Sequence, residues 1–192
     1  MRTPHLFLLE LGRLLRSRIV LVILALTLLS PLAGLTVYRP LLSTSTSGYV
    51  TTMLGTYLAN PALAAGVVGG ALFALLTLLE LDRVHRSRTD QLLDAILSPL
   101  TAALIRLWAL LCLSLMVLMA MLLVWLPYTR HAAGAVFDGE PSVLAYLIFF
   151  FPALPLSVLA AAAAYQFTRR FDLSAVLYLA FAALSLSVWS TH

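Results

Sequence analysis

Long apolar runs, separated by short charged segments, dominate the chain. An α-helix rises about 1.5 Å per residue, so roughly 20 apolar residues cross a hydrocarbon core that is about 30 Å thick. We therefore predict an all-α, polytopic membrane protein that forms a single transmembrane domain over residues 1–192. Its five predicted spans lie at about 19–38, 62–81, 103–126, 143–165 and 173–189.

Proline and glycine interrupt several of these runs. Pro31 in the first run, together with Gly34, predicts a kink, and Pro152 and Pro155 in the fourth run predict a bend, because proline lacks the amide donor that a helix needs. In the second run, Gly66 and Gly70 form a G-x-x-x-G spacing that favours close approach of two helices in lipid. This second helix is therefore expected to allow close helix packing, and dimerisation through it is one outcome of that spacing.

Residues 3–17 precede the first run and are apolar on one side only. Leucines occupy one side and charged residues the other: Leu6, Leu9 and Leu14 against Glu10, Arg13 and Arg16. The pattern predicts an amphipathic helix in the membrane interface, with arginines that reach the headgroups. The alternative is a cytosolic extension of the first span.

The longest charged interruption runs from residue 80 to residue 106, between the second and third runs. Charges at the centre of a bilayer cost about 2.5–3.5 kcal/mol or more each, so this stretch belongs in water or among headgroups. Residues 90–97 have apolar positions at helical spacing, Ser87 or Thr89 can cap a helix there, and Pro99 can stop it. We predict a short amphipathic helix on one face of the membrane.

The other connections read as surface segments. Residues 39–61 contain a Ser/Thr run, and residues 49–58 are expected to form a short interfacial helix. Trp125 and Tyr128 at the end of the third run are typical of an interfacial aromatic belt. Residues 129–142 are expected to form a solvated turn.

Composition supports the membrane class, since 62% of the residues are hydrophobic and only 10% are charged, against about 25% charged in soluble domains. All twelve basic residues are arginines, and ten of them lie on one predicted face: Arg2, Arg13, Arg16, Arg18, Arg83, Arg86, Arg88, Arg106, Arg169 and Arg170. Arg39 and Arg130 lie on the other face. The positive-inside rule then predicts a cytoplasmic N-terminus and an external C-terminus in a cell inner (plasma) membrane.

No catalytic constellation can be assembled from the sequence. The four histidines are scattered, Cys112 is the single cysteine and lies in an apolar run, and Asp138 with Glu140 reads as a solvated turn. A P-loop is impossible because the chain has no lysine, so any ATP hydrolysis belongs to another polypeptide. The arginines are too scattered for a nucleic-acid partner. We expect no enzyme activity, cofactor or metal in this chain.

The charged stretch has an ordered motif: Glu80-x-Asp82-Arg83, then T-x-x-L-L-x-x-x-L-S-P from Thr89, and a basic residue seven positions later. This order resembles the permease subunits of the ABC-2 class of ABC transporters. In that family an acidic–basic segment closes the second span, a Thr-x-x-Leu-Leu helix runs into a Ser/Thr–Pro turn, and a basic residue opens the third span. The resemblance covers about residues 5–128 by motif and the rest by topology. Arg88 stands where the family often has glycine.

The resemblance implies a permease, expected to be an exporter, whose cytoplasmic segment 83–99 couples to a separate ATP-binding subunit. ATP and magnesium would be held by that subunit, and the permease would pair with a second copy or a homologous permease. The partner-binding residues implied are Glu80, Asp82, Arg83, Arg86, Arg88, Thr89, Leu92, Leu93, Ile96, Ser98, Pro99 and Arg106. The alternative is a non-transporting membrane scaffold or assembly factor that recruits a cytoplasmic partner through the same helix.

The family usually has six spans, and this chain offers five. We therefore expect the fifth helix to show an uncovered apolar flank where a sixth would pack. The residues of this flank are Leu177, Phe181 and Leu184.

Overall fold

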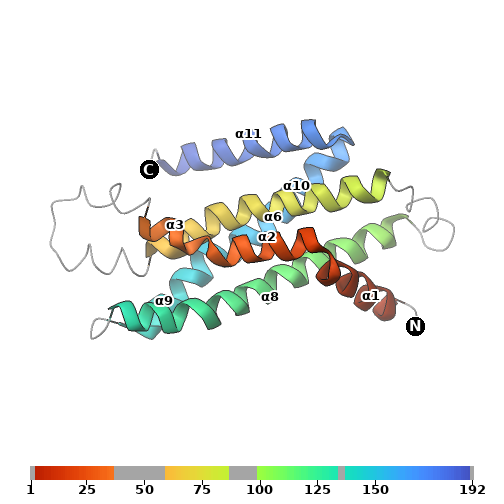
Figure 1. Cartoon of the computed structure of the whole chain (residues 1–192). Coiled ribbons are helices and arrows are strands. Elements are labelled where there is room, and N and C mark those ends of the chain that lie inside the picture. Colours follow the sequence, from red (N-terminus) through yellow and green to blue (C-terminus); the bar gives the residue numbers. More distant parts are fainter. Residues whose placement is uncertain (1–2, 37–58, 87–98, 134–136, 191–192) are drawn as a thin grey trace.

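The computed structural model describes residues 3–36, 59–86, 99–133 and 137–190, and helix is the only regular secondary structure in these ranges. The helices form an elongated bundle (Figure 1). By length and composition, α6 (Asn60–Arg86), the Leu100–His131 part of α8 (Pro99–Ala133) and the continuous Gly139–Thr168 segment can each cross a membrane. A fourth candidate span results if the two N-terminal helical segments, His5–Arg16 and Arg18–Gly34, are counted together as one bent span. The structure thus confirms an all-helical chain with three to four candidate spans.

The predicted amphipathic helix is present as α1 (Thr3–Arg16), which ends one residue before the predicted boundary. Ser17 then adopts an extended conformation, and α2 (Arg18–Leu29) begins. The two helices meet at 74°. The chain therefore bends sharply at Ser17, where the sequence predicts only a boundary between an amphipathic helix and the first span. In Figure 1, α1 points away from the long axis of the bundle.

The kink predicted at Pro31 is present as a break between α2 and α3 (Pro31–Thr36). Proline cannot donate to the Thr27 carbonyl, and Ser30 takes over: its amide and hydroxyl donate to that carbonyl at 3.1 and 2.6 Å. The Leu28 carbonyl accepts a hydrogen bond from the Trp125 indole at 2.8 Å. The break is thus stabilised by groups that satisfy nearby backbone oxygens, as a buried helix interruption requires.

Trp125 is therefore not a member of an interfacial belt, because it is buried and bonded to α2. Tyr128 is exposed and packs edge-to-face on it, with ring centroids 5.1 Å apart. The third helix also continues through Pro127 to Ala133, beyond the predicted end of the span at 126. Residues 129–133 and 139–142 of the predicted turn are therefore helical, and the Asp138 side chain caps the second of these helices by accepting from the Glu140 amide.

The fourth predicted span corresponds to three joined helices: α9 (Gly139–Ala145), the π-helical η3 (Tyr146–Phe150) and α10 (Phe151–Thr168). The π segment ends at Phe150, two residues before Pro152, so the predicted irregularity takes the form of a widened turn. Arg169 closes α10 with a left-handed backbone (φ 50°), and α11 (Phe171–Ser190) follows.

The two glycines of the G-x-x-x-G pattern lie against η3 and α10 of the same chain. A Cβ added at Gly66 would lie 2.5 Å from the Phe149 carbonyl oxygen, and one at Gly70 would lie 2.7 Å from the Ser157 hydroxyl. Both glycines are buried. The predicted close approach is confirmed, but it is intrachain, so this pair does not offer a surface to a second copy.

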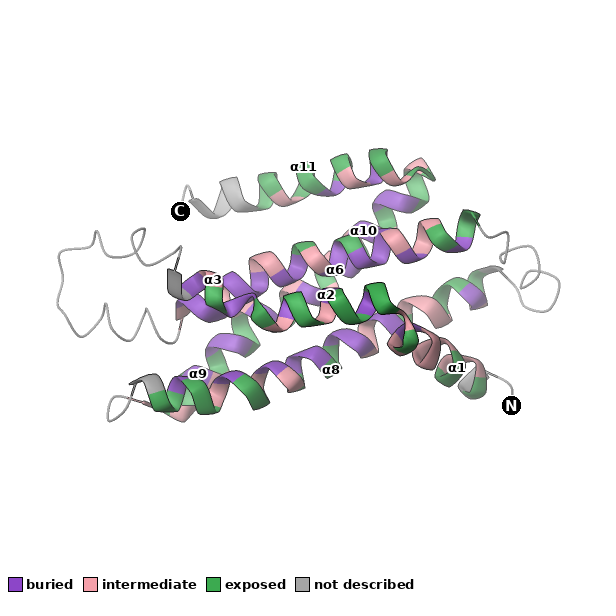
Figure 2. Ribbon diagram, viewed as in Figure 1, coloured by how far each residue is buried: buried purple, intermediate pink, exposed green. Residues whose placement is uncertain are grey.

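Helix α11 packs on α10 and α6 through one side only. Tyr178 on that side donates to the Ser157 hydroxyl at 3.1 Å. The opposite flank, which includes Leu177, Phe181 and Leu184, is exposed as predicted (Figure 2). The apolar part of α11 with described side chains, Phe171–Ser185, is shorter than the three candidate spans.

Candidate functional site

The predicted partner-binding residues fall into two groups. The described ones lie at one end of the bundle, on the last turns of α6 and the first turns of α8: Glu80, Asp82, Arg83, Arg86, Pro99 and Arg106. The others lie outside the described residues: Arg88, Thr89, Leu92, Leu93, Ile96 and Ser98. The predicted helix over 89–97 is outside them too, as are the connection 37–58 and its predicted short helix. Pro99, expected to stop a helix, is the first residue of α8.

Glu80 occupies the centre of the described group. The sequence suggested a carboxylate near water, but the residue is only 7% exposed. Its Oε2 accepts a hydrogen bond from Arg13 Nη2 at 2.6 Å. A buried carboxylate needs such a partner, because an unpaired buried charge costs several kcal/mol. The last turns of α6 are thus fixed to α1 by an ion pair that spans 67 positions of sequence.

Arg13 is held by two carboxylates at once. Its Nε and Nη2 donate to the two oxygens of Glu10, at 3.0 and 2.8 Å, while Nη2 also donates to Glu80. The two-pronged geometry suits a planar guanidinium. The hydrogen bonds to Glu10 raise the pKa of Arg13, although partial burial opposes this, so the arginine stays charged.

Weaker contacts surround this centre. Arg83 Nη1 lies 3.8 Å from the other oxygen of Glu80, and Arg86 Nε pairs with Asp82 at 2.7 Å. Both arginines are exposed, and exposed pairs contribute only about 0–1 kcal/mol. Arg106 of α8 lines, with Glu10, Arg13, Glu80 and Val84, a small cavity of about 10 Å³. Charged groups from α1, α6 and α8 therefore meet in one cluster.

The sequence missed the two α1 members of this cluster. The sequence pattern predicts that the arginines of α1 reach headgroups, whereas Arg13, held by Glu10, anchors α1 to α6 through Glu80. The local signal was their spacing of three positions, which allows a pair on one helix face. The contact to Glu80 has no such local signal.

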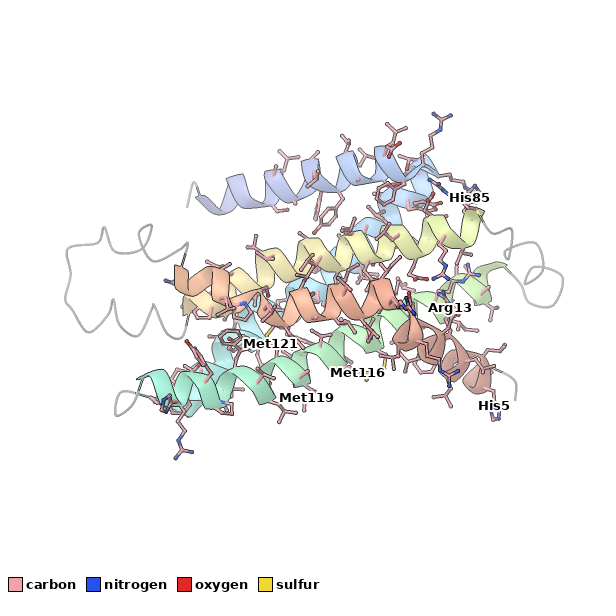
Figure 3. The ribbon with its side chains drawn as sticks, viewed as in Figure 1. His5, Arg13, His85, Met116, Met119 and Met121 are labelled. Carbon is pink, nitrogen blue, oxygen red and sulfur yellow. The ribbon has the colours of Figure 1, made fainter. Side chains whose placement is uncertain are left out.

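The described part of the chain contains no group of three or more His, Cys, Asp and Glu residues that could hold a metal ion. His5 lies on α1 and His85 near the end of α6, at the same end of the bundle (Figure 3). His131 lies on the last turn of α8, at the other end, and Cys112 is a half-buried free thiol. Several of the described charged side chains at the α1 end of the bundle take part in ion pairs.

Comparisons of the chain with family models, with curated proteins and with solved structures found no match. The class defined by the fold is a helical bundle with apolar helices of membrane-spanning length. The assignment of a function depends on the charged cluster and on the motif next to it.

Proposed function

We propose that the chain is the membrane-spanning permease subunit of an ABC-2-type ATP-driven transporter, an exporter that works as a dimer with a separate ATP-binding subunit. Its spans would be α2 with α3, then α6, α8, the α9–α10 segment and α11, while α1 would lie in the membrane interface. The motif from Glu80 to Arg106 is the sequence basis of the proposal.

The observation that carries the proposal is the Arg13–Glu80 pair. It joins α1 to α6 within seven residues of the segment 87–98, in which most of the motif lies. A segment that receives force from a partner must be connected to elements that move together, because coupling needs distinct contacts in each state. Residues of α1, the end of α6 and the start of α8 line one small cavity, and the ion pair joins α1 to α6, which supports a connection of this kind.

The direction of insertion is part of the proposal. The end of α6, the start of α8, α1 and the α10–α11 turn share one end of the bundle (Figure 1). Among the described arginines, Arg130 alone lies at the opposite end. Positive-inside then assigns the α1 end to the cytoplasm and the C-terminus to the outside. A reporter fused after Arg170 should read cytoplasmic and one after His131 external; a cytoplasmic His131 fusion would overturn this orientation.

In the proposed mechanism, residues 89–97 dock in a groove of the ATP-binding subunit. Closure of two such subunits on ATP moves the docked segment, and the charged cluster passes this movement to α6, α8 and α1. The ATP-binding subunit supplies ATP, magnesium and hydrolysis. This chain would supply the route of the substrate across the membrane and the helix that transmits the movement.

The test uses the tagged chain, solubilised in mild detergent, and a P-loop protein that copurifies with it. On the predicted docking helix, Leu93 belongs to the apolar ridge and Gln91 to the polar side. Burial of a large apolar side chain contributes about 1.5–3 kcal/mol, so Leu93→Asp should weaken binding of the ATPase by about tenfold or more. Gln91→Asp adds the same charge and should leave binding intact.

ATP turnover in proteoliposomes separates the two candidate functions. A transporter subunit predicts substrate-stimulated turnover in the wild type and its loss in Leu93→Asp. A scaffold predicts the same loss of partner but no substrate stimulation in the wild type. Undiminished copurification and transport by Leu93→Asp would overturn the assignment of the docking helix.

A further inference from the structure

A groove of about 490 Å³ lies at the bend between α1 and α2. Its walls are built from α1, from Ser17 at the bend and from the end of α6: Leu8, Leu9, Gly12, Arg13, Arg16, Ser17 and Arg83. The volume is within the range of about 300–1,000 Å³ that is typical of small-molecule sites. Three of the seven lining residues are arginines and none is acidic.

The arginines of the groove are unequally neutralised. Arg13 is fully engaged by Glu10 and Glu80, as described above. Arg83 reaches Glu80 only at 3.8 Å, and exposed Arg16 has no acidic partner among the described residues. The groove therefore presents two guanidinium groups with little or no compensation, which is the chemistry that binds phosphate oxygens.

The same groove has an apolar wall. The apolar side chains of Leu8 and Leu9 are 61% and 69% exposed, so the rest of the described chain does not cover them. On α2, beyond the bend at Ser17, the apolar side chains of Ile19 and Val22 are also exposed. A free phosphate ion would leave these side chains unused. A phospholipid would cover them with its acyl chains while its phosphate meets the arginines.

Gly12 leaves the groove open. A Cβ added at this position would have nothing within 4 Å, so the backbone of α1 is accessible from the groove. A larger side chain at position 12 can therefore fill the groove without a clash, and it replaces a residue that disfavours helix. This provides a steric probe that changes no charge.

We infer that this groove binds one anionic phospholipid, with Arg16 and Arg83 at its phosphate and with Leu8 and Leu9 along its acyl chains. A lipid with net negative charge is favoured over a zwitterionic one, because the cation of a zwitterionic headgroup would lie near the uncompensated guanidinium groups. The bound lipid would occupy the bend between α1 and the first span, next to the Arg13–Glu80 pair.

The experiment is native mass spectrometry of the purified chain, titrated with phosphatidylglycerol or with phosphatidylcholine of the same acyl chains. The wild type should retain one phosphatidylglycerol in preference to phosphatidylcholine. Arg16→Gln and Arg83→Gln should each weaken phosphatidylglycerol binding by about fivefold, as expected for a basic residue at a membrane surface. Arg130→Gln removes an exposed arginine from the other end of α8 and should change nothing.

The steric probe and an ion control complete the test. Gly12→Phe should abolish retention of the lipid, whereas Gly12→Ala should keep it. Millimolar inorganic phosphate should not displace the lipid. Equal binding of both lipids with no effect of Arg16→Gln, or full displacement by inorganic phosphate, would overturn the inference. If Gly12→Phe fails to fold by circular dichroism, the arginine variants on the exposed surface decide the outcome.

Discussion

Removal of the Arg13–Glu80 pair tests whether α1 is fastened to α6. Arg13→Met would remove the closest cation from Glu80, a residue that is only 7% exposed, and would leave Arg83 at 3.8 Å. Breaking a buried pair costs about 3–5 kcal/mol. The Arg13 side chain is 37% exposed, so solvent screening reduces this cost, and we expect about 1–3 kcal/mol.

A double-mutant cycle isolates the pair. Glu80→Leu alone should cost less than Arg13→Met, because Arg13 keeps its two hydrogen bonds to Glu10 and is partly solvated. The double variant should be less destabilised than the sum of the two single variants, since no buried carboxylate is then left alone at position 80. The loss of Glu10's partner is common to Arg13→Met and to the double variant, so it cancels in the coupling energy.

The assay is reversible unfolding in mixed micelles, with increasing mole fraction of sodium dodecyl sulfate, followed by circular dichroism. The expected coupling energy is about 1–3 kcal/mol. Single variants that each change the free energy of unfolding by less than about 0.5 kcal/mol, with additive effects in the double variant, would refute the reasoning.

Two further predictions use the same assay. Trp125→Phe removes the donor to the Leu28 carbonyl and should cost about 1–3 kcal/mol, whereas Trp108→Phe, at a 62% exposed position, should be nearly neutral; equal effects at the two positions would count against a structural role for the indole hydrogen bond. Gly66→Val places a side chain against the backbone of η3 and should cost more than about 2 kcal/mol, while Gly12→Val points into open space and should cost far less; a tolerated Gly66→Val would contradict the close packing of α6 on η3.

The sequence predicts most of the helices, because apolar run length and charged interruptions act locally. It also predicts α1, since an amphipathic pattern next to an apolar run separates two helices. The size of the bend at Ser17 cannot be predicted from the local sequence. It depends on where α1 packs, and α1 packs on α8 and is paired to α6.

Two sequence patterns leave the partner of a contact undetermined. The spacing of Gly66 and Gly70 indicates a close helix contact but carries no information on whether the neighbour belongs to the same chain. Trp125 matches the composition of an interfacial belt, but its position is decided by a backbone carbonyl 97 residues earlier. In both cases the partner is distant in sequence.

The candidate site also contains residues that the sequence predicts and residues that only the fold brings together. The motif identified Glu80 and its neighbours on α6 from order alone, and the structure brings them to one end of the bundle with Arg106. Glu10 and Arg13 could not be assigned to this cluster from the sequence, because an ion pair across 67 positions leaves no periodic pattern. The helix predicted over 89–97 lies outside the described residues and stays a prediction.

The most direct measurement of the proposed coupling is site-specific photocrosslinking. It is feasible because the chain has a single native cysteine, which one substitution removes. Cys112→Ala gives a cysteine-free background, into which Leu93→Cys or Gln91→Cys is introduced and labelled with a thiol-reactive photocrosslinker. In membrane vesicles that contain the ATP-binding subunit, the account predicts a cross-link to that subunit from position 93, a much weaker one from position 91, and a change in yield at 93 between ATP and nucleotide-free conditions. Equal or absent cross-linking at the two positions, with no response to nucleotide, would contradict it.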